Sequence, residues 1–209
     1  MVSRHFDDMG APNGSEGALS APHQPMNVPI PVKIVVAGGF GVGKTTFVNS
    51  ISEIDPLRTE AAMTDRSIGV DEINVATAKS ATTVAMDFGR VTLGNDELIL
   101  YLFGTPGQER FHFMWDELVK GAIGAVVLVD TTRLADSFAA IDYFEQRGLP
   151  FVVGVNCFHG AVRHRLEDVR DALALNPAVP LFPTDARARN ATQQALIVLV
   201  QHAMAAASA

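Results

Sequence analysis

A glycine-rich segment near residue 40 has the residue types and spacing of a phosphate-binding loop. Residues 38–45, GGFGVGKT, fit the pattern G-x-x-x-x-G-K-[ST] without a mismatch. Glycines let main-chain N–H groups approach phosphate oxygens, Lys44 supplies a full positive charge, and the Thr45 hydroxyl is a hard oxygen ligand suited to Mg²⁺. An ordinary glycine-rich turn is the alternative interpretation. The complete pattern between a predicted strand and a predicted helix favours phosphate binding.

The elements that must position this loop alternate between strand and helix patterns. Strands are predicted over 32–37, 82–93, 97–103, 122–130, 149–156 and 179–182, and helices near 44–54, 134–147, 162–175 and from about 190. Alternation of this kind predicts an α/β fold, a mostly parallel six-stranded sheet with helices on both faces. The turn residues 94–96, GND, predict one antiparallel edge hairpin.

Two further stretches resemble a known family. Residues 103–111, FGTPGQERF, resemble the second switch of Ras-like and Rab-like small GTPases, and residues 83–88, TVAMDF, are similar to the end of the first switch. Asn156 and Ala186 stand where the two base-recognition motifs of that family occur. More narrowly, the chain resembles bacterial small-GTPase-like proteins of conservon-type operons, related to the gliding-motility switch GTPase. The resemblance covers residues 32–209 and implies a Ras-like P-loop NTPase domain.

The resemblance implies roles for individual residues. Gln108 would orient the attacking water, with Lys44 and Thr83 as further catalytic residues, and Thr45 and Thr83 would hold Mg²⁺. The implied contacts to GTP or GDP are Gly39, Gly41, Val42, Gly43, Lys44, Thr45, Thr46, Gly107, Asn156, Cys157, Ala186 and Arg187.

The carboxylate that supports Mg²⁺ in the family is missing at its usual place. Gly104 stands there. Asp87 on the neighbouring predicted strand is one candidate to replace it. Asp130, which ends a hydrophobic strand, is the other, with a helix cap or loop carboxylate as its alternative interpretation.

The residues expected around the base also depart from the family pattern. Asn156 is followed by Cys157 in place of Lys, and His159 stands in place of the Asp that accepts two hydrogen bonds from guanine. A neutral His has one acceptor nitrogen, so this bidentate recognition is lost. Cys157 is more typical of a small buried residue than of a reactive thiol.

Charge and aromatic residues around the predicted switches leave alternatives open. Arg58 and Arg66 lie in the first-switch segment, either close to the phosphates or as solvated loop charges, and no intrinsic arginine finger is evident. An aromatic cluster follows Gln108. Part of it must pack under a helix, and the rest either joins the core or forms a surface for a partner. Its members are Phe111, Phe113, Met114 and Trp115.

Composition bounds the classes of protein that this chain can belong to. Hydrophobic residues make up 48% and the net charge is −7, which exclude global disorder and argue against nucleic-acid binding. The single cysteine excludes an internal disulfide framework. No apolar run approaches the roughly 20 residues of a membrane helix. We therefore expect a cytoplasmic protein without direct membrane insertion, reaching a membrane only through a partner.

The N-terminal residues 1–31 have the composition of a tail. They are rich in Pro, Gly and Ser with few apolar residues, which predicts disorder, and a docking arm for a partner is the alternative. Residues 32–209 are predicted to form the nucleotide-binding domain.

Three functional hypotheses follow. The first is a GTP/GDP switch with Mg²⁺ and slow hydrolysis that signals to regulatory proteins, for which the resemblance implies roadblock-type and sensor-kinase-like partners. The second is a nucleotide-binding scaffold with little turnover or with relaxed base specificity that includes ATP. The third is a small P-loop ATPase or kinase, ranked last because no arginine-rich lid is visible.

Overall fold

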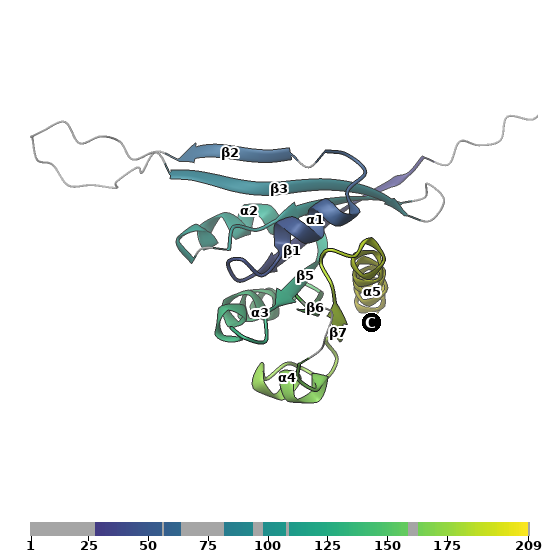
Figure 1. The fold of residues 1–209 in the computed structure, drawn as a ribbon. Coiled ribbons are helices and arrows are strands. Elements are labelled where there is room, and N and C mark those ends of the chain that lie inside the picture. The colour runs from purple at the N-terminus through teal and green to yellow at the C-terminus, as the bar shows by residue number, and fades with distance from the viewer. Residues whose placement is uncertain are drawn as a thin grey trace, which may run out of the picture.

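The described residues fold around one sheet of seven strands in the order β2-β3-β4-β1-β5-β6-β7 (Figure 1). The computed structural model describes residues 28–55, 57–63, 82–93, 98–107, 109–158 and 163–208. The strands are β1 Ile30–Gly38, β2 Leu57–Met63, β3 Thr82–Leu93, β4 Leu98–Gly104, β5 Ala122–Val129, β6 Phe151–Asn156 and β7 Leu181–Thr184. The helices are α1 Lys44–Ile51, the 3-10 helix η1 Glu109–Met114, α2 Trp115–Val119, α3 Ala135–Arg147, α4 Leu166–Ala172 and α5 Arg189–Ala207.

Parallel pairing brings the functional loops to one edge of the sheet. β1 pairs in parallel with β4 and β5, and β6 and β7 continue the parallel series. β2 and β3 pair antiparallel, as do β3 and β4. Because the carboxyl ends of parallel strands meet at one edge, residues 38–45 lie there together with the loops that follow β4, β5, β6 and β7.

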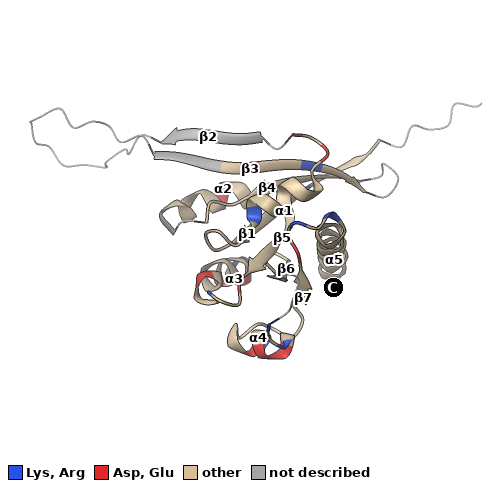
Figure 2. Cartoon of the chain, in the orientation of Figure 1, with Lys and Arg blue, Asp and Glu red and all other residues tan. Residues whose placement is uncertain are grey.

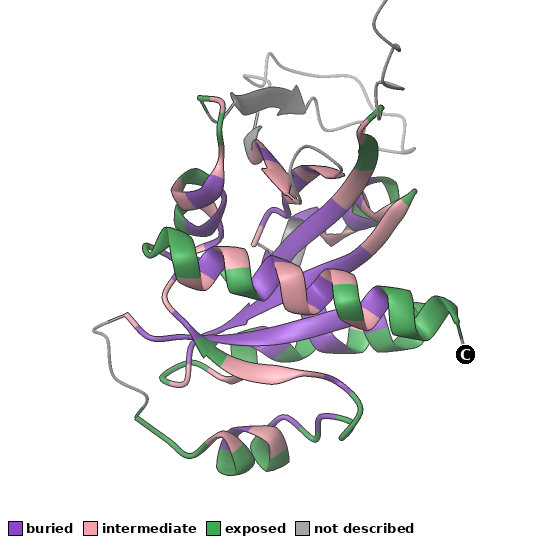
Figure 3. Cartoon of the chain, turned by 90° about the vertical axis from the view of Figure 1, so that its right-hand side faces the viewer, coloured by how far each residue is buried: buried purple, intermediate pink, exposed green. Residues whose placement is uncertain are grey.

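Both faces of the sheet are covered, which explains the uninterrupted apolar runs of the central strands. Ile34 and Val36 of β1 face one core with residues of α1 and α5, whereas Val35 and Ala37 face the opposite core with residues of α2, α3 and α4. The central strands are accordingly the most buried part of the molecule (Figure 3). Charged residues lie mainly on helices and loops, conspicuously on α4 (Figure 2).

The predicted mostly parallel sheet with its antiparallel hairpin is confirmed, and β2 extends the antiparallel edge to give seven strands in place of the expected six. Residues 57–63, LRTEAAM, carry little of the apolar and β-branched composition that marks a strand, so the sequence predicts no strand in this part of the first-switch segment. β1 begins at Ile30, two residues before the predicted strand. The predicted tail up to residue 27 and the turn at 94–96 lie outside the described residues.

Candidate functional site

Residues 38–45, hereafter the P-loop, connect β1 to α1 in a conformation that depends on glycine. Gly43, which precedes the first residue of α1, has φ 106°, in the region that favours glycine. A Cβ at Gly43 would stand 2.6 Å from Asn156 Nδ2, so a side chain there would displace the Asn156 amide. The loop therefore ends at the N-terminus of α1, where the helix dipole favours an anion.

The Lys44 ammonium is buried inside the P-loop. Its Nζ donates hydrogen bonds to the carbonyl oxygens of Gly38 at 2.8 Å and Gly39 at 2.7 Å, and the residue is 8% exposed. Burial lowers the pKa of Lys44 to about 8, against an opposing effect of the nearby Asp87 charge. A buried cation held in this way is suited to binding a polyanion.

Asp87 is the carboxylate that reaches the P-loop. Thr45 Oγ1 donates a hydrogen bond to Asp87 Oδ2 at 2.5 Å, from α1 to the middle of β3. A Cβ at Gly104 would stand 3.2 Å from Asp87 Cβ and 3.3 Å from its Oδ2. The lack of a side chain at Gly104 thus leaves the room that Asp87 occupies. Of the two candidate replacements, the structure places Asp87 beside Thr45.

Asp130 has the alternative role of a loop carboxylate. Its Oδ1 accepts hydrogen bonds from the Thr132 main-chain N–H at 2.9 Å and the Thr132 hydroxyl at 2.7 Å, and its Oδ2 accepts one from Arg133 Nε at 3.4 Å. Burial acts to raise the pKa of Asp130, but the hydrogen bonds from Thr132 and Arg133 outweigh it and hold the pKa below its usual value. Asp130 therefore fixes the loop between β5 and α3.

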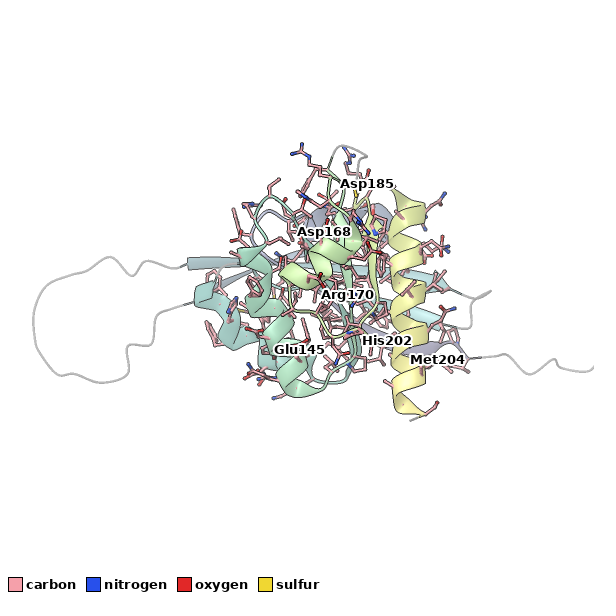
Figure 4. The ribbon with its side chains drawn as sticks, turned by 90° about the horizontal axis from the view of Figure 1, so that it is seen from below. Glu145, Asp168, Arg170, Asp185, His202 and Met204 are labelled. Carbon is pink, nitrogen blue, oxygen red and sulfur yellow. The ribbon has the colours of Figure 1, made fainter. Side chains whose placement is uncertain are left out.

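Asn156 ties the P-loop to the end of β7. Its Nδ2 donates to the Val42 carbonyl at 2.8 Å, and its Oδ1 accepts from the Ala186 N–H at 3.1 Å. Cys157 follows it as a buried thiol whose pKa burial raises, in agreement with the expectation of a small buried residue. Arg187 forms an ion pair with Asp185. Figure 4 labels Asp185 near the beginning of α5. The structure thus joins Asn156 and Ala186, while the role of both in base recognition stays a prediction.

A cavity of about 270 Å³ lies next to Asn156. Its lining includes Gly41 of the P-loop, Asp130 and Arg133 after β5, Asn156 and Cys157 after β6, and Arg163. The cavity lies between the P-loop and the loops expected to hold the nucleoside part of a nucleotide.

The segment after β4 is packed against the P-loop. A Cβ at Gly107 would stand 2.6 Å from Lys44 Nζ and 2.9 Å from Phe40 Cα, so the Gly107 backbone lies directly over the loop. Trp115 Nε1 donates to the Pro106 carbonyl at 3.3 Å and fastens this segment to α2. Gln108 and His159 lie outside the described residues.

Two further predicted residues lie on α1 and β3. Thr46 is exposed on α1. Thr83 lies on β3, opposite Ala62 of β2 and four residues from Asp87. At the usual rise of a strand, the Thr83 backbone lies about 13 Å along β3 from that of Asp87, and the role of Thr83 stays a prediction.

The aromatic cluster after Gln108 divides between core and surface. Trp115 and Phe111 are 2% and 7% exposed, whereas Phe113 is 60% exposed. Trp115 stacks on Phe144 and meets Tyr143 edge-on, which joins α2 to α3. Two members of the cluster therefore join the core, while a partner for the exposed Phe113 stays a prediction.

Sequence reasoning missed Arg133. Its Nη2 donates to the Phe40 carbonyl of the P-loop at 3.1 Å. The available signal was its position four residues after the end of β5, at the sheet edge where the P-loop lies.

Within the described part of the chain, no group of three or more His, Cys, Asp or Glu side chains is arranged to hold a metal ion. The helices described there include none long and apolar enough to span a bilayer.

Comparison with known proteins gives the family. A family model described as "Conserved hypothetical ATP binding protein" matches residues 36–206. The chain belongs to this family.

Individual relatives point to the Ras-like superfamily. Uncharacterized protein MJ1339 of Methanocaldococcus jannaschii is 30% identical over 127 residues, 60% of this chain and 69% of that protein. Human Ras-related protein Rab-7b is 23% identical over 84% of this chain and 83% of its own length. The predicted membership in the Ras-like GTPase superfamily is confirmed, and the narrower conservon resemblance stays a prediction.

Solved structures show the same fold. The cytosolic domain of the T. maritima FeoB iron transporter in a GDP form gives a TM-score of 0.60 at 16% identity, over 84% of this chain and 64% of that chain. The FeoB G-domain from Methanococcus jannaschii gives 0.55 at 14% identity, over 83% and 98%. The chain thus spans 64% of the first of these structures and nearly all of the second.

The two hydrogen bonds of the Asn156 side chain give the first testable prediction. Replacing Asn156, which is 7% exposed, with Ala leaves the Val42 carbonyl and the Ala186 N–H without their side-chain partner. We expect the free energy of unfolding, measured by urea denaturation, to fall by about 2–4 kcal/mol. Asn176→Ala, which removes an exposed acceptor of the Ala178 N–H, is the control and should cost less than about 1 kcal/mol. An equal loss of unfolding free energy in the two variants would contradict the stabilising role of these two hydrogen bonds.

Proposed function

We propose that the chain is a small GTP-binding switch that binds GTP or GDP with Mg²⁺, hydrolyses GTP slowly and signals to a protein partner. The observation that carries this proposal is the preformed P-loop, in which Lys44 is buried between the Gly38 and Gly39 carbonyls and Asn156 ties the loop to Ala186. Main-chain amides, a buried cation and a helix N-terminus together favour a nucleotide phosphate chain.

The oxygen ligands near the P-loop fit Mg²⁺. Thr45 would bind the ion through its hydroxyl, and Asp87, which accepts the Thr45 hydrogen bond, would support it from β3. When bound, the ion would neutralise charge on the phosphates. Hydroxyl and carboxylate oxygens are the donor types that this hard cation prefers.

Hydrolysis would depend on positioning by the segment after β4. Gln108 would orient a water for attack on the γ-phosphorus, and the Gly107 main chain, which lies against Lys44, would meet the γ-phosphate. The products are GDP and inorganic phosphate. Loss of the γ-phosphate would release this segment, and the exposed Phe113 that follows it would present the change to a protein partner.

The partner remains part of the proposal. The sequence resemblance favours regulatory proteins of the roadblock and sensor-kinase-like types. The exposed aromatic side chain of Phe113 is of the type that anchors protein interfaces.

A second candidate function is a nucleotide-binding scaffold with relaxed base specificity that includes ATP. The sequence has Cys157 and His159 in place of the Lys and Asp that the Ras-like pattern uses around guanine. The description of the family as ATP-binding also supports it.

Base preference tests the two candidates. We expect GDP with Mg²⁺ to raise the midpoint temperature of unfolding more than ADP at the same concentration, because a ligand stabilises the folded state according to its affinity. The measurement is a thermal melt monitored through Trp115. Lys44→Ala is the control and should abolish both shifts. Equal shifts from both nucleotides in the wild-type chain would remove the guanine preference and favour the second candidate.

Asp87 gives a test of the magnesium site. Asp87→Asn should weaken GDP binding about 10- to 100-fold with Mg²⁺ and change it little with EDTA, as measured by titration calorimetry. Asp168→Asn, an exposed carboxylate on α4, is the matched control.

The double variant Asp87→Gly, Gly104→Asp returns a carboxylate to the end of β4 and should recover part of the Mg²⁺ dependence. An unchanged affinity of Asp87→Asn with Mg²⁺ would contradict this role of Asp87.

Turnover separates the switch from the scaffold. Gln108→Leu should slow the conversion of bound GTP to GDP by about 10- to 100-fold in a single-turnover assay, because the attacking water is no longer oriented. Binding of GDP should be unchanged. Gln146→Leu on the exposed side of α3 is the matched control. If Gln108→Leu and the wild-type chain convert GTP at the same rate, the scaffold is the better description.

A further inference from the structure

We propose that Arg133 is a positioning residue that orients the main-chain N–H of Gly41 toward the phosphates bound by the P-loop. This inference rests on the proposed nucleotide binding. Arg133 lies in the loop between β5 and α3, outside the P-loop motif and the base-recognition segments. Its Nη2 donates a hydrogen bond to the Phe40 carbonyl at 3.1 Å across a sequence separation of 93 residues.

The geometry of the peptide bond connects this contact to Gly41. In a trans peptide, the carbonyl oxygen and the N–H of the next residue point in opposite directions. Arg133 holds the Phe40 oxygen from the side of α3, and its Nη2 stands 3.6 Å from the position of a Cβ at Gly41. The N–H of Gly41 must therefore point away from Arg133. Gly41 has φ 72°, a conformation that a free glycine readily leaves, so an external restraint on this peptide matters.

Arg133 is itself held in place. Its Nε lies 3.4 Å from Asp130 Oδ2 and its Nη1 lies 3.7 Å from Asp136 Oδ2. Asp130 is fixed in turn by two hydrogen bonds from Thr132. These contacts reduce the rotamer freedom that the half-exposed guanidinium loses when it binds the Phe40 carbonyl.

The start of α3 supports the same part of the loop. A Cβ at Gly39 would stand 2.6 Å from Asp136 Cβ, so α3 packs directly on the P-loop backbone next to Phe40. The Asp136 N–H bonds to the Arg133 carbonyl at 3.1 Å, which links this contact to the Arg133 loop. α3 and the loop before it thus buttress the P-loop at neighbouring residues.

The other restraints on the P-loop act elsewhere. Lys44 holds the Gly38 and Gly39 carbonyls from inside the cradle, and Asn156 holds the Val42 carbonyl. Among the hydrogen bonds of the described residues, the Arg133 contact restrains the peptide between Phe40 and Gly41. A glycine-rich loop loses conformational entropy when it binds phosphate, and a restraint made in advance reduces that cost.

The experiment compares nucleotides of different phosphate length. For wild type, Arg133→Ala and Arg133→Lys, the dissociation constants of a nucleoside diphosphate and the matching monophosphate are measured by calorimetry, with GDP and GMP or, if the wild type prefers adenine, ADP and AMP. Arg165→Ala, an exposed arginine paired with Glu167, is the matched control.

We expect Arg133→Ala to weaken the diphosphate about 5- to 20-fold and the monophosphate about twofold or less, because a P-loop amide acts on the phosphate chain. Arg133→Lys should recover part of the loss, since it keeps one charged donor. Arg165→Ala should bind both nucleotides as the wild type does. A general loss of stability would weaken the binding of both nucleotides equally, so a changed ratio of the two constants excludes that explanation.

Two outcomes overturn the inference, and they are distinguishable from failure of the proposed function. If the wild type binds the diphosphate and Arg133→Ala has the same ratio as the wild type, Arg133 does not position Gly41 and nucleotide binding stands. If the wild type binds neither GDP nor ADP, the proposed function fails and this inference fails with it. If thermal melts without nucleotide show that Arg133→Ala does not fold, Arg133→Gln, which also removes the charge, provides the same comparison.

Discussion

A buried positive charge at the carboxyl edge of the sheet is the constraint on which the site depends. Transfer of an ammonium group from water into a protein is costly unless polar groups surround it. Two interactions offset this cost. The Gly38 and Gly39 carbonyls accept hydrogen bonds from Lys44, and the Asp87 carboxylate lies nearby. The turn of the P-loop, the end of β1, the start of α1 and the middle of β3 are all arranged around this single ammonium group.

The position of the Asp87 carboxylate depends on the two neighbouring strands β3 and β4. β4 ends at Gly104, which offers no side chain, and the antiparallel neighbour β3 sends Asp87 into the space that this glycine leaves. The hydrogen bond from Thr45 to Asp87 then joins α1 to β3 and couples the P-loop to the antiparallel part of the sheet.

The amount that could be predicted differed between elements for physical reasons. The central strands were predicted because two-sided burial selects continuous apolar runs, and β1 and β5 show this plainly. The strand β2 was missed because it lies at the sheet edge and its sequence, LRTEAAM, has neither a clear alternation nor a high β propensity. Arg133 was missed because its position after a predicted strand places it at the carboxyl edge of the sheet but does not show that its side chain contacts the P-loop.

The sequence by itself determined the P-loop, because its parts lie within eight consecutive residues. The spacing of these residues fixes how a glycine-rich turn leads into a helix. Two contacts were decided by the tertiary structure alone. Thr45 donates its hydrogen bond to Asp87 and not to Asp130, and Arg133 donates a hydrogen bond to the Phe40 carbonyl of the P-loop. These contacts join residues 42 and 93 positions apart. Their existence depends on the register of β3 against β4 and on the docking of α3 beside the P-loop, which no local pattern of residues encodes.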